Sequence, residues 1–390
     1  MAESFLFNSA LFALACVACF WKKEASLILT LPALSALVNR TQNKENRLGV
    51  KPPNILDRLA RDRALTKGDA INLMVREGSA EDLRACRALH YSAGLPYNEA
   101  CWRALPGMWK VLLTMGAMQL FLVEDRTRPP SSRIVSFGAT IFATAEFCSA
   151  AESTLPPYLG VQIARYYLSH VTPVLQREAV ARANAREGLN VVMCFEGWGL
   201  HGLSREQVLA VREKQSEAFH LTHAGYRIRE VLADPSDDEE LHWMLNAGAH
   251  VRRDYSGYFR RHSAPTCYQP RPRLVGLTKE EAWANPGSFL SSFFVHTPPR
   301  FHFNRSEQLL LHHALMGETS DDLATSLCIS PWTVKKRWQA IYERVADVDH
   351  ELLLPPVANG AHVTARGAER RRPLLHYLRQ HLEELRPFIG

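Results

Sequence analysis

A short cationic run near the C-terminus has the chemistry of phosphate binding. The segment Lys335–Arg337 is entirely basic, and Arg344 follows it. The dipeptide Ser330–Pro331 comes just before, and it is typical of a helix start because serine caps free backbone amides and proline has no amide to leave unpaired. Lysine and arginine side chains donate hydrogen bonds to phosphate oxygens. The run therefore indicates a helix that can bind a polyanion.

The candidates for acid–base catalysis are scattered along the chain. Glu146 and Glu196 stand near the ends of predicted strands and are candidate general bases, while Tyr226 or His223 is a candidate acid. Single polar residues at strand ends are more often structural, so no catalytic residue is assigned and enzymatic activity stays open. No metal site is predicted, because the CxxC motif at residues 16–19 has no second pair of ligands near it.

The cationic run must be presented by a helix that packs through its other face. On a helix over residues 331–345, the apolar residues that share one stripe are Val334, Trp338, Ile341 and Val345. A shorter helix predicted over 320–327, with Leu323, Leu327 and Ile329, can supply the partner surface. A short helix, a turn and a basic second helix fit a helix-turn-helix, in which the second helix enters the major groove of DNA. The residues predicted to contact DNA are Ser330, Trp332, Thr333, Lys335, Lys336, Arg337, Gln339 and Arg344.

This stretch, SEQLLLHHALMGETSDDLATSLCISPWTVKKRWQAIYERV, resembles the LuxR-type helix-turn-helix domain. The matching features are Glu307, Gly317, Leu323–Ala324, Ile329–Pro331, Thr333–Lys335 and Ile341–Glu343. The resemblance implies sequence-specific binding of double-stranded DNA, usually as a homodimer, in bacterial transcription control. The sequence departs from the family at Trp332, where lysine or glutamate is common, and at Arg337, where histidine is frequent.

The end of the chain also departs from the family. Its fourth helix should follow Val345, but Pro355–Pro356 interrupts that stretch. A later helix is predicted over residues 367–387, and its leucines fall on one stripe. That stripe either packs on its own domain or supplies a dimer surface.

Residues 69–235 alternate strands and helices, as in a mixed α/β domain. The segment VREGSAEDLRACRAL resembles the opening strand and helix of the GNAT acyltransferase family, and EAFHLTHAGYRIREVL resembles its closing helix and strand. That family holds acyl-coenzyme A through a basic residue or glutamine and a glycine-rich turn at a helix N-terminus, where free amides meet phosphate. In PPYLGVQIA, residues 156–164, Gly160 is the one remaining candidate cofactor contact, and Pro157 replaces the basic residue.

The two resemblances together predict an α+β fold, with a mixed α/β GNAT-like sandwich followed by an all-α LuxR-type helix-turn-helix domain. The function they imply is a bacterial DNA-binding transcription regulator with a non-catalytic, sensory or dimerising GNAT-like domain. The alternative is an acyl-coenzyme A-dependent N-acyltransferase that carries a DNA-binding domain. The implied partners are double-stranded DNA, a second copy of the chain and a small-molecule effector. No cofactor is expected under the first interpretation, and acyl-coenzyme A under the second.

Length and charge agree with this organisation. The chain has 390 residues, 46% of them hydrophobic, which allows two or three domains. Its net charge of +6 suits a polyanionic partner. The predicted parts are an apolar N-terminal segment (1–48), a linker (49–68), the GNAT-like domain (69–235), a connector (236–300), the helix-turn-helix domain (301–346), and a linker with a C-terminal amphipathic helix (347–390).

The N-terminal segment leaves three interpretations open. Residues 5–21 are almost uncharged, and Lys22 and Lys23 follow them. This length is at the lower edge for a membrane-spanning helix, and a span would leave the rest of the chain in the cytoplasm. The other two interpretations are a helix packed on the protein body and residues upstream of the true start. We expect a cytoplasmic protein, and the alternative is a membrane-anchored one with its DNA-binding domain in the cytoplasm.

Overall fold

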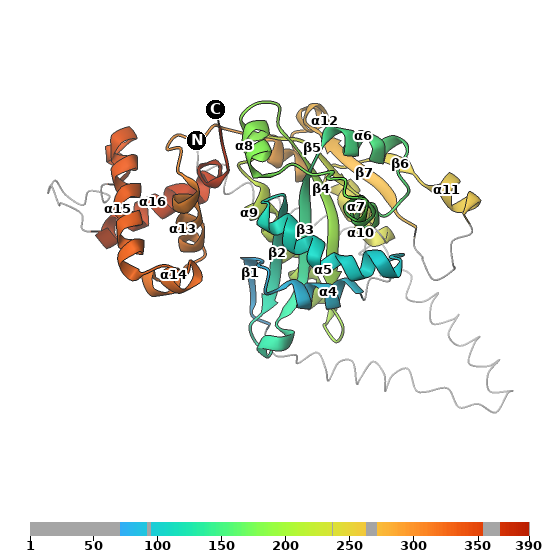
Figure 1. Ribbon diagram of the computed structural model, residues 1–390, viewed down its shortest axis with the longest axis horizontal. Coiled ribbons are helices and arrows are strands. Elements are labelled where there is room, and N and C mark those ends of the chain that lie inside the picture. Colours follow the sequence, from blue (N-terminus) through green and yellow to red (C-terminus); the bar gives the residue numbers. More distant parts are fainter. Residues whose placement is uncertain (1–70, 92–94, 236, 263–270, 354–366, 390) are drawn as a thin grey trace, which may run out of the picture. The chain divides into compact units, whose positions relative to one another are not determined.

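The computed structural model describes residues 71–91, 95–235, 237–262, 271–353 and 367–389 (Figure 1). The predictions for segments 1–48 and 49–68, including the apolar stretch 5–21, lie outside these residues. Among the residues described, no helix combines the length and the apolar character needed to cross a membrane.

The central element is a mixed sheet of seven strands in the order β1-β2-β3-β4-β5-β7-β6. The strands are β1 (Leu73–Glu77), β2 (Met118–Asp125), β3 (Ile134–Ala143), β4 (Leu189–Trp198), β5 (Ile228–Ala233), β6 (His250–Asp254) and β7 (Arg273–Thr278). Strands β4 and β5 are parallel, and the other neighbours in the sheet are antiparallel. This sheet, together with its helices, confirms the predicted α+β class.

The sequence predicts that the sheet domain ends near residue 235, but the sheet continues beyond that residue. Strands β6 and β7 both lie within the predicted connector 236–300 and extend the sheet, so this part of the chain is more than a connector. Arg252 of β6 forms an ion pair with Glu281, and Arg253 donates a hydrogen bond to the carbonyl of Leu155 (2.7 Å). These arginines hold β6 in place, which explains why a strand of such polar composition is stable at the edge of the sheet.

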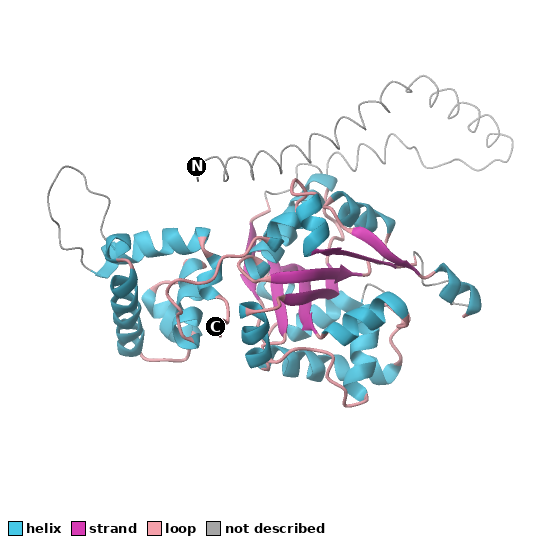
Figure 2. Ribbon diagram, turned by 90° about the horizontal axis from the view of Figure 1, so that it is seen from above, coloured by secondary structure: helices cyan, strands magenta, loops and turns pink. Residues whose placement is uncertain are grey.

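Helices cover both faces of the sheet (Figure 2). Helices α4 (Leu83–Tyr91) and α5 (Glu99–Thr114) pack on one face, and α9 (Arg205–His223) packs on the other. Side chains alternate along β2 accordingly: Leu120 and Leu122 belong to the core under α4 and α5, whereas Phe121 contacts the core under α9. Because successive side chains of a strand point to opposite faces, one sheet contributes to two cores, one on each face.

Three helices connect β3 to β4: α6 (Ala145–Ser153), α7 (Leu159–Leu168) and α8 (Arg177–Ala185). The predicted strand over 133–147 is too long, because the Thr144 side chain accepts a hydrogen bond from the amide of Phe147 and begins α6. The remaining elements of this region are η2 (Pro130–Ser132), α10 (Asp238–Asn246), α11 (Ser256–Arg261), α12 (Lys279–Ala284) and η3 (Leu290–Phe294).

The C-terminal region is helical. Its elements are α13 (Arg305–Leu315), α14 (Ser320–Ser326), α15 (Pro331–Val348), η4 (His350–Leu353), α16 (Gly367–Gln380) and η5 (Leu382–Leu385). Leu374 and Leu378 of α16 are buried in one core with residues of α13, α14 and α15. Of the two interpretations of the late leucine stripe, the structure therefore shows packing within its own region.

The chain after α16 returns to the sheet region. Arg386 is buried and donates hydrogen bonds to the carbonyls of Leu221 (2.6 Å) and Ala224 (2.9 Å), and its guanidinium lies 4.9 Å from the ring centre of Tyr226. The side-chain amide of Asn184 donates to the carbonyl of Pro387 (2.8 Å). The last residues thus join the helical region to the end of α9 and to α8.

Candidate functional site

Helices α14 and α15 form a tight helix–turn–helix pair. The turn Leu327–Ser330 includes Cys328 at φ +52°, and the amide of Ile329 donates to the carbonyl of Ala324 (2.9 Å). The Ser330 hydroxyl accepts the amide of Thr333 (3.1 Å) and so caps α15, as the sequence predicts. The buried side chains of α15 are Val334, Trp338, Ile341 and Val345, which is the predicted stripe. Packing of this stripe on the other helices fixes which face of α15 meets solvent.

The solvent face of α15 carries Trp332, Lys335, Lys336 and Gln339, all exposed. Trp332 is 62% exposed, and the Lys336 ammonium lies 4.1 Å from its ring centre. The Gln339 amide donates to the carboxylate of Glu343 one turn later (3.0 Å). The face combines two cations, a planar amide and an exposed aromatic ring, which are groups that contact phosphates and base edges.

Four other residues predicted to contact DNA are placed differently. Arg344 forms an ion pair with Glu307 (3.1 Å), whose side chain is only 3% exposed, so Arg344 holds α15 against α13. The Ser330 and Thr333 hydroxyls hydrogen-bond to each other (2.8 Å) as part of the helix cap. Arg337 is half-buried on the flank of the exposed face. The four residues predicted for the exposed face are therefore exposed, and Arg337 and Arg344 lie at its flank.

The sheet region has its own opening, where the parallel strands diverge. The ladder between β4 and β5 stops at Met193 and Ala233, and β4 continues to Trp198 paired with β3. Cys194 has no partner on β3, because Ala139 pairs with Phe195 and Thr140 with Met193, so a bulge lies at the point of divergence. The loop 199–204 then leads into α9, which begins with a Ser204–Gln207 capping box.

The sequence places the candidate phosphate-binding turn at Gly160. In the structure, Gly160 does not lie at the start of the helix that follows the parallel strand β4. That helix is α9, and the glycines before it are Gly199 and Gly202. Gly160 lies in the first turn of α7, where an added Cβ would stand 2.5 Å from the carbonyl oxygen of Cys194. Close packing against β4 explains a glycine at residue 160 without any ligand.

The start of α7 enters the opening between the strands. The Leu159 amide donates to the carboxylate of Asp234 at the end of β5 (2.6 Å), while Gly160 packs on β4 at Cys194. Burial raises the pKa of Asp234 to about 7, although the Leu159 amide lowers it. Burial also raises the pKa of Glu196, and the charges of Asp237 and Asp234 add to that effect. The opening is therefore acidic and partly filled by the chain itself.

The four acid–base candidates lie apart. Glu146 is exposed in the first turn of α6. Glu196 lies on β4 at the opening. Tyr226 is 3% exposed in the core under α9, with its ring centre 4.9 Å from that of Phe142. His223 is fully buried, donates from Nδ1 to the carbonyl of Phe219 (2.8 Å) and accepts at Nε2 from the Thr140 hydroxyl (2.7 Å); burial lowers its pKa to about 3. The amide of Tyr226 donates to the carbonyl of His223 (3.3 Å), but no hydrogen bond joins the side chains of the four candidates.

A buried histidine beside the opening is not predictable from the sequence. His90 of α4 donates from Nδ1 to the carbonyl of Glu196 (2.6 Å) and accepts at Nε2 from the Tyr97 hydroxyl (3.0 Å). Burial lowers its pKa to about 4, so the ring is neutral near pH 7. No local pattern in the sequence marks this contact. The loop before α9 is different, because two glycines followed by serine and, three residues later, glutamine form a readable helix start.

Comparisons with known proteins give likenesses only among solved structures. No family model and no curated protein matches the chain. The C-terminal condensation domain of Ebony in complex with beta-alanyl-dopamine is 12% identical, covers 54% of this chain and 100% of its own, and has a TM-score of 0.33. FeeM, an N-acyl amino acid synthase from uncultured soil microbes, is 9% identical over 57% of this chain and 98% of its own, with a TM-score of 0.32.

Mutant forms of the spermidine/spermine N-acetyltransferase SpeG from Vibrio cholerae are 8% identical over 55% of this chain and 98% of their own, with a TM-score of 0.31. All three TM-scores are below 0.5, so these likenesses assign no activity. The α+β assignment rests on the sheet itself, with its central parallel pair that diverges after a bulge.

Proposed function

We propose that the chain binds double-stranded DNA through α15, with α14 supporting it, and acts as a bacterial transcription regulator. One observation carries the proposal: the face of α15 opposite its buried stripe presents Trp332, Lys335, Lys336 and Gln339 directly after a tight turn. A helix held from behind and cationic in front suits the major groove, which is wide enough to admit a helix.

The GNAT-like sheet region is, in this proposal, a sensory or dimerising platform and not a catalytic one. Support comes from the scattered acid–base candidates and from the opening between β4 and β5, which holds the start of α7 and several carboxyl groups. A homodimer is expected because the resemblance of the helical region to LuxR-type domains implies one.

Selection from a random duplex library tests the proposal. The full chain should enrich a defined motif, and its affinity for the enriched duplex should fall steeply as salt rises, because cationic contacts release counterions from DNA. The matched control is Lys214, a partly exposed lysine of α9 that pairs with Glu217; Lys214→Ala should leave the affinity unchanged. Enrichment of no motif, or an affinity independent of salt, would remove the proposal.

A second candidate function is acyl-coenzyme A-dependent N-acyl transfer. The divergence of β4 from β5 at the Cys194 bulge, followed by a glycine-bearing loop and a long helix, favours it. Helix N-termini attract phosphate groups. Coenzyme A added to the full chain should then raise the melting temperature, since a ligand bound by the native state stabilises it. An unchanged melting temperature would leave DNA binding as the one function proposed.

A further inference from the structure

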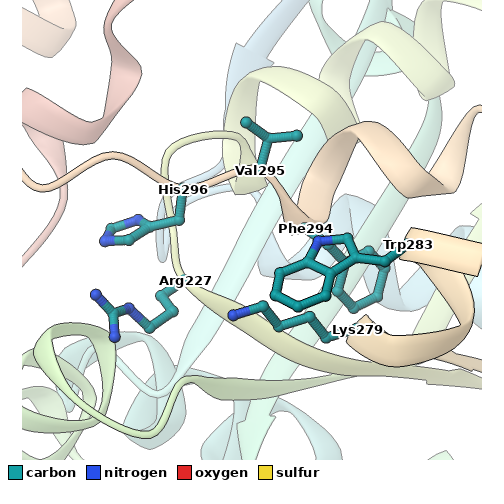
Figure 3. A pocket seen from close by; sticks show the side chains of 6 residues that line it. All are labelled: Arg227, Lys279, Trp283, Phe294, Val295 and His296. Carbon is teal, nitrogen blue, oxygen red and sulfur yellow. The ribbon is translucent and has the colours of Figure 1, made fainter. Parts of the chain in front are cut away.

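A pocket of about 340 Å³ shares no lining residue with the α15 face or with the β4–β5 opening. It is lined by Arg227, Lys279, Trp283, Phe294, Val295 and His296 (Figure 3). Arg227 precedes β5, Lys279 and Trp283 belong to α12, and the other three lie at the end of η3 and in the segment that leads to α13. Residues far apart in sequence thus converge on one concave site.

The charge of the pocket is positive. Arg227 and Lys279 both line it, no carboxylate lines it, and neither cation has an ion pair with a carboxylate of the described residues. One guanidinium nitrogen of Arg227 donates to the carbonyl of Arg186 (2.7 Å), which anchors that side chain. The Lys279 ammonium lies 4.5 Å from the ring centre of Trp283. Two cations in the lining of one concave site, with no carboxylate in that lining, favour the binding of an anion there.

One ring nitrogen of His296, Nε2, has no hydrogen-bond partner among the described residues. Its Nδ1 donates to the carbonyl of Gly225 (3.3 Å), which leaves Nε2 as the acceptor of a neutral ring. Nε2 is shielded from solvent and has no hydrogen-bond partner among the described residues. Burial and the nearby charge of Arg227 lower the pKa of His296, which agrees with a neutral ring. A buried acceptor without a hydrogen-bond donor is uncommon in native proteins, so a bound ligand or water is expected to donate to Nε2.

The rest of the lining is apolar. Trp283 is 62% exposed and Val295 is 70% exposed, whereas Phe294 is buried. Figure 3 shows Trp283 beside Phe294, with the ammonium of Lys279 extending toward Arg227. Exposed apolar groups that gather at a cationic pocket suit a ligand with an apolar body and an anionic end.

We propose that this pocket binds a small organic anion, a carboxylate or a phosphate on an aromatic or short aliphatic body. The anion lies between Arg227 and Lys279, the apolar body contacts Trp283 and Val295, and a donor on the ligand or a water satisfies His296. Because Val295 and His296 belong to the segment that leads to α13, the ligand contacts both the sheet region and the segment that joins it to the helical region. The proposal does not depend on DNA binding.

Calorimetric titration of the full chain tests the site with three probes of similar size: benzoate, phenyl phosphate and the neutral benzyl alcohol. We expect at least one anion to bind with a submillimolar dissociation constant and the alcohol to bind at least about tenfold more weakly, since a charge-assisted hydrogen bond contributes that much. The stronger anion tells a carboxylate ligand from a phosphate one. Failure of both anions to bind at millimolar concentration, or equal binding of the alcohol, would overturn the proposal.

Variants place the binding at this pocket. Lys279→Gln should weaken binding of the stronger anion at least about tenfold, while Lys214→Gln on α9 should not change it. The Lys279 side chain is partly exposed and packs over the Trp283 ring, so the variant should fold. Arg227→Gln gives a second arm, and its melting temperature reports whether removal of the hydrogen bond to Arg186 disturbs the fold. Anion binding that survives both substitutions in folded protein would contradict the assignment.

Discussion

At the scale of single residues, burial decides which polar groups can do chemistry. His223, His90 and Tyr226 are all buried. Burial lowers the pKa of the two histidines and raises the pKa of Tyr226, so it favours the neutral form of each side chain. Asp234 differs, because it lies at the opening between β4 and β5 and its pKa is raised to about 7. The titration of Asp234 should therefore be visible near neutral pH.

The variant Asp234→Asn should flatten the pH dependence of stability. The folded pKa of about 7 exceeds the ordinary aspartate value of 3.8, so the folded state holds a proton that the unfolded state has lost. The stabilisation is complete below the unfolded pKa and disappears as pH rises through 7. The asparagine side-chain oxygen can still accept the hydrogen bond from the Leu159 amide, but asparagine does not titrate. Urea unfolding of both proteins between these pH values measures the difference, and identical slopes would show that Asp234 titrates normally.

At the scale of elements, local signals make α15 predictable. The Ser330–Pro331 cap and the apolar stripe from Val334 to Val345 need no knowledge of the remaining chain. The ion pair of Arg344 is not predictable, because its partner Glu307 lies 37 residues away and a helical wheel cannot show an ion pair of that range. The entry of α7 into the sheet opening is unpredictable for the same reason, since Leu159 and Asp234 are 75 residues apart.

The sheet beyond residue 235 shows a second limit. Strand β6 reads HVRRD, and its mostly exposed or half-buried side chains give no apolar alternation. Its stability comes from pairing with β7 and from the partners of Arg252 and Arg253, which the sequence does not reveal. A polar edge strand is therefore indistinguishable from a connector until its neighbour is known.

Gly225 and Gly317 form a matched pair for testing one close approach of two backbones. Both have left-handed backbone, with φ of +86° and +88°, so alanine strains either position similarly. An added Cβ at Gly225 would collide with the backbone of Leu382 and Glu383, whereas nothing lies near one at Gly317. Gly225→Ala should lower the free energy of unfolding by about 1–3 kcal/mol more than Gly317→Ala. Chemical denaturation gives both values, and equal decreases would mean that η5 does not pack on Gly225.

At the scale of the whole molecule, residues Ala70–Gly390 form one compact unit in which the sheet and helical regions are joined by side chains of the last residues. Arg386 is one such link, because its guanidinium donates hydrogen bonds to carbonyls at the end of α9, while Gln308 of α13 donates to the carbonyl of Arg386 (2.9 Å). His296 contacts the carbonyl of Gly225 in the same area. A change in the sheet region therefore has a physical route to the helices that present α15.

The central claim is that the solvent face of α15 reads DNA, and affinity for the selected duplex tests it most directly. The variant Lys335→Ala/Gln339→Ala removes two exposed groups without touching the buried stripe, so circular dichroism should show an unchanged fold. Removing a side chain that reads a base costs about 1–3 kcal/mol of binding free energy, so the double variant should bind at least about tenfold more weakly and no longer prefer the selected motif. Lys214→Ala should match the unaltered chain. A folded double variant that keeps both affinity and site preference would contradict the claim.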